Sequence, residues 1–252
     1  MLSFLKKNAK QAENNNSIEI TKVPTHIAII PDGNRRWAKL HHVPTKVGHR
    51  EGAYTFKRMV KAADRYGVKY ITFYAFSTEN WSREQTEVDA LMELMLGFLQ
   101  NAEKEIGGDN VIIKVIGDRT RLSSQLQQEI ERVERLTATN TGLTLFLGIN
   151  YGGRSELVHS VKTIAQKVVD GSLSVEQIQE STIAENLYTG GYPDPDLLIR
   201  TSKEERISNF LLYQLAYTEF YFTDVLWPDF NEDEFQKALL CYQERQRRFG
   251  GA

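Results

Sequence analysis

The sequence predicts an α/β protein built on a mostly parallel sheet of about six strands, flanked by helices. Two observations support this class. From Thr25 onward, short apolar runs rich in β-branched and aromatic residues alternate with longer stretches of helical periodicity, which is the pattern of βαβ units. In addition, 252 residues is a common size for one large α/β domain, so no second domain is required.

Each element is predicted from its own local signals. The strands are expected at residues 26–30, 68–76, 111–117, 143–151, 196–200 and 220–222. Helices are expected over residues 49–67, which end on Gly67 as a C-cap, and over 123–136, which begin at a serine N-cap. Residues 231–250 are predicted to be a helix capped by Asn231, and residues 171–195 a loop around one short helix.

A long helix is predicted over residues 84–106. Its apolar residues recur at helical spacing: Val88, Leu91, Met92, Met95, Leu96 and Leu99. Most such stripes pack against the core of a protein, and spacing alone favours that interpretation. The alternative is that the stripe forms the wall of an apolar tunnel.

The charge balance argues against nucleic acid as a partner. Lysine and arginine total 31 against 33 acidic residues, so the net charge is −2 and no overall basic field attracts nucleic acid or an anionic membrane. Arginine clusters must therefore serve local anions. The single cysteine excludes a disulfide or a cysteine zinc site within one chain.

Residues 1–23 are predicted to be a flexible tail, and residues 24–252 a single folded domain. The apolar stretch near the N-terminus is too short for a secretory signal, and no run approaches the ~20 apolar residues of a membrane-spanning helix. We therefore expect a cytoplasmic protein. Leu2, Phe4 and Leu5 lie beside lysines and could touch a membrane surface, although a frayed tail is the favoured interpretation.

The most informative segment is HIAIIPDGNRRW, residues 26–37, in which an apolar run ends at a Pro-Asp-Gly turn. Open α/β proteins build their sites at the carboxyl ends of strands. The Asp32 carboxylate could hold Mg²⁺, while Arg35 and Arg36 offer guanidinium groups that match phosphate oxygens. A diphosphate ester with a metal suits this chemistry, and a solvated surface turn is the alternative.

Residues 77–83 follow the second predicted strand and therefore lie at the same edge of the sheet. The polar and aromatic candidates here are Phe76, Ser77, Thr78, Glu79, Asn80, Trp81 and Arg83. Aromatic rings beside amide and guanidinium groups suit a ligand that is apolar at one end and polyanionic at the other. The alternative is an ordinary helix start, with Ser82 as N-cap and Trp81 as a hydrophobic staple.

A third cluster follows the fifth predicted strand. Arg200, Arg206 and Ser208 could clamp a second diphosphate, and Glu219 could complete a metal site begun by Asp32. Loops that bear arginine thus follow three of the predicted parallel strands. Together they predict a site for two anions, although their spacing cannot establish that they meet.

Several familiar chemistries are excluded, because the chain has no GxxxxGK[ST], no GxGxxG after a strand, no HExxH and no GxSxG. The histidines also lack metal-ligand spacing. His49 follows a glycine and is predicted to open a helix, and a helix N-terminus favours anions. The alternative for His49 is a solvated or capping side chain.

Specific motifs run from about Pro24 to Gly250. They include HIAIIPDGNRRWA, GHREG, YAFSTENWSR, LTLFLGINYGGR, LLIRT, RISNFLLYQLAYTEFYFTDVLWPDF and RRFGG. On these residues the chain resembles the cis-prenyltransferase family. The resemblance implies a parallel sheet with an apolar tunnel, and a homodimer.

The resemblance also implies the reaction. An allylic diphosphate, typically farnesyl diphosphate, would be extended by repeated condensation with isopentenyl diphosphate, and each step would create a cis double bond. The expected product is undecaprenyl diphosphate, the precursor of the lipid carrier for cell-wall polymers. Mg²⁺ is the expected cofactor, no nucleic acid is expected, and contact with the membrane would come through the lipid product.

Roles are carried over from the resemblance position by position. Asp32 and Glu219 would bind the metal. The family commonly assigns proton removal to the amide at Asn80, but positioning by Asn80 with a diphosphate oxygen as the proton acceptor is chemically easier. The allylic diphosphate would contact Gly33, Asn34, Arg35, Arg36, Thr45, Lys46 and His49, and the site would be bordered by Trp37, Phe76 and Trp81. The remaining substrate contacts would come from Ser77, Thr78, Glu79, Arg83, Arg200, Arg206, Ile207 and Ser208, of which Arg200, Arg206 and Ser208 would hold isopentenyl diphosphate.

This chain departs from the family pattern at Thr45, where members often have an arginine. Two alternatives remain open. Phe146 and Gly148 on the fourth strand could change the depth of the tunnel and give a shorter product. The chain could also be a non-catalytic partner subunit or a phosphate-binding protein, but its retention of Asp32 and of the segment 206–209 argues against this.

Overall fold

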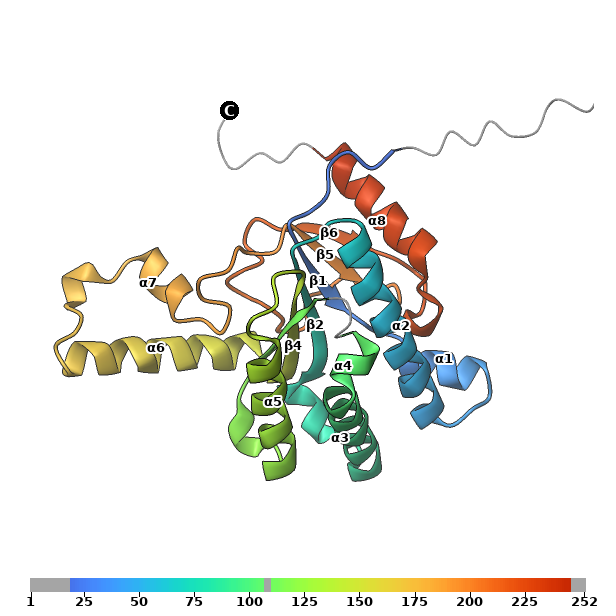
Figure 1. Cartoon of the computed structure of the whole chain (residues 1–252), viewed down its shortest axis with the longest axis horizontal. Helices are drawn as coiled ribbons and strands as arrows, with labels where there is room; N and C mark the ends of the chain where they lie inside the picture. Colours follow the sequence, from blue (N-terminus) through green and yellow to red (C-terminus); the bar gives the residue numbers. More distant parts are fainter. Residues whose placement is uncertain (1–18, 107–109, 246–252) are drawn as a thin grey trace, which may run out of the picture.

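Parallel strands form one sheet at the centre of the protein (Figure 1). The computed structural model describes residues 19–106 and 110–245, and within these residues the strand order is β3-β4-β2-β1-β5-β6. The strands are β1 (His26–Ile30), β2 (Tyr70–Ser77), β3 (Ile112–Ile116), β4 (Thr144–Tyr151), β5 (Leu197–Arg200) and β6 (Glu219–Phe222). All pairings are parallel, so the predicted strands and their arrangement are confirmed.

Helices and short 3₁₀ turns connect the strands. The helices are α1 (Asn34–Leu40), α2 (Thr45–Arg65), α3 (Gln85–Gln100), α4 (Ala102–Glu105), α5 (Ser124–Thr137), α6 (Gly153–Val169), α7 (Glu180–Glu185) and α8 (Glu232–Glu244). The 3₁₀ turns are η1 (Thr78–Ser82), η3 (Arg119–Arg121), η4 (Val175–Gln177) and η5 (Trp227–Asp229). The predicted caps are confirmed, since Ser123 accepts from the Leu126 N–H and Asn231 accepts from the Glu234 N–H.

Three helix predictions need correction. The second helix begins at Thr45, so His49 lies in its second turn and not at its N-terminus. The predicted helix over residues 84–106 is two helices, which are separated at Asn101. Helix α8 ends at Glu244, and the last predicted residues of that helix lie outside the described part of the chain. Helices α1 and α6 were not predicted.

The two faces of the sheet are covered differently. One face carries the larger apolar cluster, which includes Ile27, Phe73 and Leu145, and it packs against α2, α3, α5 and α8. The opposite face carries a smaller cluster with Tyr74 and Phe146, which is covered by tyrosines and by the segment that contains Phe210, Leu211 and Leu215. The helical layer is therefore one-sided.

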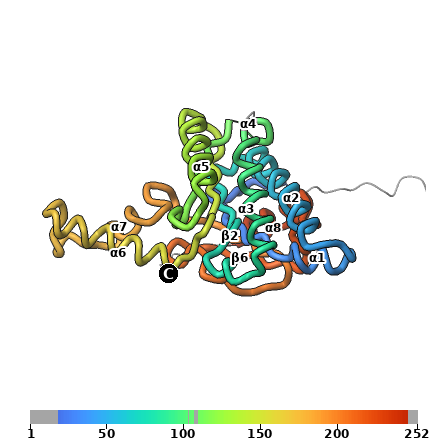
Figure 2. Tube along the Cα trace, turned by 90° about the horizontal axis from the view of Figure 1, so that it is seen from below, coloured from blue at the N-terminus to red at the C-terminus, as the bar shows by residue number. Residues whose placement is uncertain are grey.

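Helices α6 and α7 project away from the sheet as an arm, and this arrangement is visible in two perpendicular views (Figures 1 and 2). Valines on α6 are exposed, with 54% of Val158, 62% of Val161 and 81% of Val169 accessible.

Near the N-terminus, Gln243 on α8 accepts hydrogen bonds from the N–H groups of Thr21 and Lys22. Most of the predicted tail, residues 1–18, lies outside the described chain.

We also searched the described residues for a membrane-spanning segment. Within 19–106 and 110–245, no helix combines the length and the apolar character needed to cross a bilayer.

Candidate active site

The strand order brings the predicted loops together. Strand β1 lies between β2 and β5, so the loops that follow these three strands are neighbours at the carboxyl edge of the sheet. Strand β2 pairs with one side of β1, and β5 pairs with the other side. The direction of the strand order therefore changes at β1, and open α/β sheets bind ligands at such a switch point. Polar side chains from all three loops meet in one cavity of about 960 Å³.

Most of the predicted site residues line this polar cavity. They are Asp32, Gly33, Asn34, Arg35, Arg36, His49, Ser77, Glu79, Asn80, Arg83, Arg200, Arg206 and Ser208. Six arginines and three carboxylates lie in the lining, so its formal charge is +3 when His49 is neutral. The cavity is therefore a local anion site in a chain whose net charge is −2.

The Asp32 turn is held by hydroxyl groups from the loop after β5. The Asp32 N–H donates to Thr201 Oγ1 at 2.9 Å, and the Asp32 carbonyl oxygen accepts from Thr201 at 2.6 Å and from Ser202 at 2.9 Å. Gly33 has a φ of 113°, and a Cβ at this position would lie 2.1 Å from Ser202 Oγ, so only glycine fits. The turn thus presents the Asp32 carboxylate to the cavity, where 33% of it is exposed.

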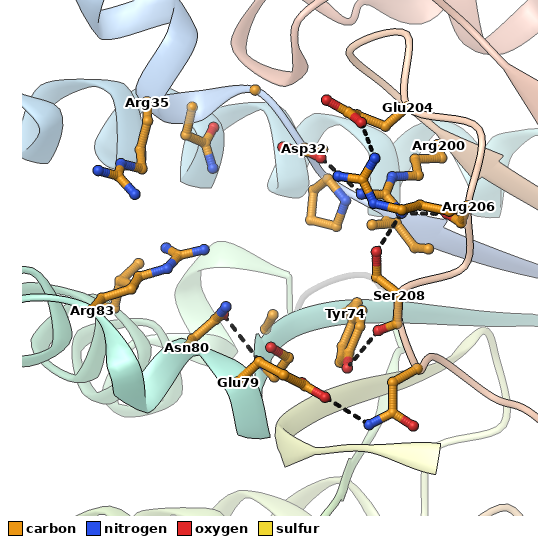
Figure 3. Close-up of a pocket in the computed structure, with 18 of the residues that line it drawn as sticks. Asp32, Arg35, Tyr74, Glu79, Asn80, Arg83, Arg200, Glu204, Arg206 and Ser208 are labelled. Atoms are coloured by element: carbon orange, nitrogen blue, oxygen red, sulfur yellow. Dashed lines mark hydrogen bonds and ion pairs between the residues drawn. The ribbon is translucent and has the colours of Figure 1, made fainter. Parts of the chain in front are cut away.

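Arg200 links the Asp32 turn to the next loop (Figure 3). Its side chain is 4% exposed, and it donates to Asp32 Oδ2 at 3.0 Å, to Ser208 Oγ at 2.7 Å and to the carbonyl oxygen of Arg206. This buried guanidinium group therefore positions its neighbours as well as contributing charge. Most of the Arg206 side chain remains accessible, with 63% exposed.

Glu204 is a second carboxylate beside this cluster. It lies 3.0 Å from Arg36 and forms an ion pair with Arg206, while Arg36 also lies 3.7 Å from Asp32 Oδ1. Asp32 and Glu204 thus compensate only part of the charge of Arg36, Arg200 and Arg206. The uncompensated positive charge favours an anionic ligand.

A third carboxylate, Glu87, orients cationic groups on the other side of the cavity. His49 Nε2 lies 3.1 Å from Glu87 Oε1, Arg83 donates to the same oxygen at 2.9 Å, and Arg35 lies 3.8 Å from Oε2. Burial lowers the pKa of His49 and outweighs the opposing effect of Glu87. Although burial raises the pKa of Glu87, the hydrogen bond from His49 and the charges of Arg83 and Arg35 lower it overall.

The η1 turn presents Asn80 through a capping box. Asn80 Oδ1 accepts from the Ser77 N–H at 3.1 Å, so the amide oxygen is engaged within the turn and the NH₂ group is the part that remains for a ligand. Glu79 accepts from Asn209 Nδ2 at 2.8 Å (Figure 3). Burial raises the pKa of Glu79, but its hydrogen bonds, chiefly from Asn209, lower it overall.

Several predicted site residues do not line the polar cavity. Trp37, Thr45, Phe76, Thr78, Trp81, Ile207 and Glu219 line neither this cavity nor the groove described below, and Lys46 lines only that groove. Phe76 is fully buried against Trp81, with ring centroids 5.0 Å apart. Trp37 donates to Asp229 at 2.7 Å. The aromatic residues thus contact neighbouring segments of the protein and not the cavity.

Glu219 does not meet Asp32 within the chain. It begins β6, where it pairs in register with Leu197, whereas Asp32 follows the far end of β1. The two carboxylates therefore lie at opposite edges of the sheet, and Glu219 instead accepts from Arg245 at 2.8 Å. The expectation of a metal site shared by these two residues in one chain is wrong, because the strand register separates them by about five residues of extended chain.

Tyr74, Arg154 and Glu204 also line the cavity and were not predicted. Asn209 and Leu91 line it as well, the first from the segment 206–209 and the second from the predicted apolar stripe. Tyr74 lies inside a strand and contacts the Ser208 carbonyl oxygen at 3.3 Å through its hydroxyl group. Arg154 was already within the motif NYGGR, so its signal was present in the sequence and was not used.

A second cavity of about 690 Å³, which we call the apolar groove, lies between α2 and α3. It shares Pro31, Asn34, His49, Ala75 and Leu91 with the polar cavity. From β4 it is lined by Leu147 and Ile149, which alternate along the strand with Phe146 and Gly148. Phe146 and Gly148 therefore do not set the depth of the groove, and that expectation is wrong.

Buried polar atoms around the cavity are consistent with a polar ligand. Among the described residues, Asn34 Oδ1, His49 Nδ1 and Arg200 Nε are buried without a hydrogen-bond partner, and all three residues line the polar cavity. No group of three potential metal-ligating side chains occurs in the described chain. The Asp32 carboxylate is one-third exposed to the cavity and could hold a Mg²⁺ ion that substrate phosphates also bind, which is a common arrangement for this metal.

The fold and the site together define an α/β protein whose cationic cavity and adjoining groove suit a polyanion joined to an apolar chain. The chain belongs to the undecaprenyl diphosphate synthase family of prenyltransferases, whose family model matches residues 30–250. The resemblance found in the sequence is thereby confirmed over nearly the whole chain.

Individual relatives agree with this assignment. The chain is 51% identical to an isoprenyl transferase of Bacillus subtilis, over 91% of this chain and 88% of the relative. It is 48% identical to the ditrans,polycis-undecaprenyl-diphosphate synthase ((2E,6E)-farnesyl-diphosphate specific) of Haemophilus influenzae, over 93% and 98% of the two chains. The crystal structure of lavandulyl diphosphate synthase from Lavandula x intermedia, in complex with dimethylallyl diphosphate, superposes with a TM-score of 0.88 at 41% identity, covering 91% and 99% of the chains.

Proposed function

We propose that the protein is a Mg²⁺-dependent cis-prenyltransferase that extends farnesyl diphosphate with isopentenyl diphosphate and produces undecaprenyl diphosphate. The observation that carries this proposal is a polar cavity of charge +3 that is continuous with an apolar groove in a chain of this family. An allylic diphosphate needs both features, because its head is polyanionic and its tail is a hydrocarbon.

The two sides of the polar cavity suit two different diphosphates. His49 lines both the polar cavity and the apolar groove, and Arg35 lies on the same side because both contact Glu87. We assign the allylic diphosphate to this side, together with the backbone at Gly33. Arg206 and Ser208 lie on the other side, next to Arg200, and we assign isopentenyl diphosphate to them. This division lets the hydrocarbon tail of the allylic substrate enter the groove directly.

In each condensation, the C–O bond of the allylic ester breaks and its C1 bonds to C4 of isopentenyl diphosphate. A proton leaves C2 of the latter, and inorganic diphosphate is released. Guanidinium groups fixed around the leaving diphosphate stabilise the charge that develops on it, which is usually the largest catalytic term. Asp32 would hold Mg²⁺ against the diphosphate oxygens, and the metal would supply Lewis-acid stabilisation of the leaving group.

Asn80 is proposed to position substrate rather than to accept the proton. Its amide oxygen is engaged by the Ser77 N–H, and a neutral carboxamide has little proton affinity near neutral pH. Its free NH₂ group can donate to a diphosphate oxygen. A diphosphate oxygen is then the more suitable acceptor of the proton.

We further propose that the protein is a cytoplasmic homodimer that contacts the membrane only through its lipid product. The arm formed by α6 and α7 supports the dimer, because Val158 and Val161 expose apolar surface on a helix that stands away from the sheet (Figure 1). A second copy of the chain would cover this surface.

The direct test is incubation of the purified protein with farnesyl diphosphate, radiolabelled isopentenyl diphosphate and Mg²⁺. We expect a C55 product, no product after treatment with EDTA, and recovery when Mg²⁺ is added back. Absence of any prenyl product under all metal conditions would overturn the proposed activity. Product formation that is insensitive to EDTA would overturn the role of the metal alone.

A further inference from the structure

The apolar groove has a near end and a far end. The near end is the boundary with the polar cavity, at His49 on α2 and Leu91 on α3. The lining then continues along α2 to Lys57 and along α3 to Leu99, and it reaches Asn101 just beyond α3. At ~1.5 Å per residue these helical stretches extend roughly 10 to 15 Å. Lys57 and Asn101 therefore lie at the far end.

An ion pair lies at this far end. The Lys57 ammonium on α2 contacts Glu105 Oε2 on α4, and both residues line the groove. The two side chains are largely buried, with 25% of Lys57 and 26% of Glu105 exposed. The Lys57 ammonium also lies 5.5 Å from the centre of the Tyr54 ring, which is within the range of a cation–π contact.

Apolar residues precede this ion pair along the groove. Phe56 lies next to Lys57 on α2, while Phe98 and Leu99 lie on α3, and the Phe56 and Phe98 rings pack edge to face with centroids 5.1 Å apart. The lining before this point is mainly apolar, with Lys46, Arg50 and Glu93 as its charged members, so a hydrocarbon chain that extends from the polar cavity meets mostly apolar surface. To extend further, the hydrocarbon would have to separate the partly buried charges of Lys57 and Glu105 or pack against them.

Separating such a pair is unfavourable. A partly buried charge that loses its partner retains its desolvation penalty, and a hydrocarbon cannot replace the lost ionic contact. The pair also joins α2 to α4, so parting it would require these two helices to move apart. Both effects resist passage of an apolar chain.

We propose that the Lys57–Glu105 ion pair is a specificity-determining element, which limits product length by closing the far end of the apolar groove against the growing chain. This inference rests on the proposed function, because it takes the groove as the site of the hydrocarbon. Neither Lys57 nor Glu105 lines the polar cavity, so the proposed role is separate from diphosphate binding.

The test compares the product lengths of charge variants. The variant Lys57→Met/Glu105→Leu removes both charges, and we expect its main product to be longer than that of the parent protein by at least one C5 unit. Lys57→Gln/Glu105→Gln removes the charges and keeps polar groups, and we expect a smaller shift in the same direction. Products are dephosphorylated and resolved by reverse-phase chromatography and mass spectrometry.

Two further variants separate the ion pair from general effects. The exchanged pair Lys57→Glu/Glu105→Lys retains the interaction in reverse, so we expect it to restore the parent product length. Arg65→Met breaks the exposed Arg65–Glu232 pair between α2 and α8, outside the groove, and should leave the distribution unchanged.

The outcomes have distinct meanings. If both neutral variants give the parent distribution, or if the exchanged pair lengthens the product as much as they do, the inference is overturned. If the parent protein makes no prenyl product, the proposed function fails instead. Melting temperatures identify any unfolded variant. If one of the two neutral variants is unfolded, the product length of the other still tests the inference, because the two differ in side-chain packing.

Discussion

At the scale of single residues, the site is a set of arginines whose charges are only partly compensated. Asp32 and Glu204 contact Arg36, Arg200 and Arg206, and Glu87 contacts a second group from behind the wall. A diphosphate can displace such ion pairs because guanidinium groups bind phosphate oxygens in the same geometry as carboxylates. The carboxylate that loses its arginine contact, Asp32, is then available to a metal.

The first prediction concerns Asp32. We expect Asp32→Asn to lower kcat by about 10²–10³-fold, because it removes an electrostatic contribution to the leaving-group step and preserves the size of the side chain. Steady-state turnover with farnesyl and isopentenyl diphosphates measures this loss, and thermal melting checks that the variant is folded. A folded variant with parental turnover would exclude Asp32 from the chemistry.

The second prediction separates the two diphosphates. Arg206→Ala should raise the KM for isopentenyl diphosphate about ten- to a hundredfold, since a charge-assisted hydrogen bond contributes ~1.5–3 kcal/mol. Arg35→Ala should instead raise the KM for farnesyl diphosphate. Arg206 is preferable to Arg200 for this test, because the Arg200 side chain is 4% exposed and holds the neighbouring loop.

The matched control for these variants is Lys203→Ala. Lys203 is an exposed cation of the same loop that pairs with Asp224, and it does not line the cavity. We expect both KM values to remain unchanged in this variant. Equal increases for both substrates in Arg206→Ala would contradict the proposed division of the arginines.

At the scale of elements, one side chain attaches the η1 turn to the ends of two strands. Asn150 on β4 accepts from Trp81 Nε1 at 2.7 Å and donates to the Asp118 carbonyl oxygen, also at 2.7 Å. The Arg121 guanidinium lies 4.2 Å from the Trp81 ring centre, on the face of that ring. Asn150 has a φ of 50°, which asparagine tolerates better than most residues. This attachment fixes the turn that carries Asn80.

The third prediction tests this attachment. Asn150→Gly removes the amide without straining the backbone, and Trp81→Phe removes the indole N–H while it keeps an aromatic ring. Each should lower kcat about five- to tenfold, because the net contribution of one hydrogen bond is ~1 kcal/mol. In the double variant the loss should be smaller than the sum of the two, since both variants remove the Trp81–Asn150 bond, while Asn150→Gly also removes the bond to the Asp118 carbonyl oxygen. Fully additive losses in kcat would show that the bond does not position Asn80.

Helix packing also depends on individual glycines. A Cβ on Gly48 would lie 2.3 Å from the Asn34 carbonyl oxygen, so α2 can approach α1 only because this position has no side chain. The close approach buries His49 against the cavity and brings it to Glu87. The contribution of His49 therefore comes from its side chain and not from a helix N-terminus.

At the scale of the whole molecule, a buried histidine in the core makes the stability of the fold depend on pH. His26 at the start of β1 is fully buried, and its ring nitrogens contact the Pro193 carbonyl oxygen and Thr72 Oγ1, each at 2.7 Å. Burial lowers its pKa from 6.5 to about 4. The folded state therefore disfavours the protonated form more than the unfolded state does.

The fourth prediction follows from this difference. Between pH 6.5 and about 4 the unfolded chain binds a proton at His26 that the folded chain does not, so stability falls as the pH falls through this window. A shift of this size corresponds to about 3 kcal/mol at the acidic end. Denaturant unfolding at several pH values should show a shallower pH dependence for His26→Asn than for the parent. Parallel profiles would contradict the assignment.

The fifth prediction concerns assembly. Val158→Asp/Val161→Asp places charges on the exposed face of the α6 arm, so we expect the variant to dissociate into monomers that remain folded. Sedimentation velocity measures the oligomeric state, and circular dichroism verifies the fold. Val175→Asp, on the η4 turn of the same arm, is a control for the added charge. A parent protein that sediments as a monomer would contradict the homodimer.

The sequence by itself determined the class of fold, the strands and the loops that carry the chemistry. Alternating apolar runs and helical periods are local signals, so His26–Ile30 and the other strands could be found without knowledge of their partners. The short motifs that follow β1, β2 and β5 were also local. They sufficed to single out Asp32, Asn80 and Arg206 as candidates and, with the family resemblance, to indicate a diphosphate ligand.

Only the tertiary structure decided which side chains face that ligand. Strand order brings three loops together, and strand register places Glu219 at the opposite edge from Asp32, yet neither property is encoded in local spacing. The period of a strand likewise does not say which face meets the helices, so Phe146 was assigned to the tunnel although its neighbour Leu147 lines the groove. Contacts between residues distant in sequence, such as Lys57 with Glu105, arise from packing of whole helices, and for that reason they become visible only in the folded chain.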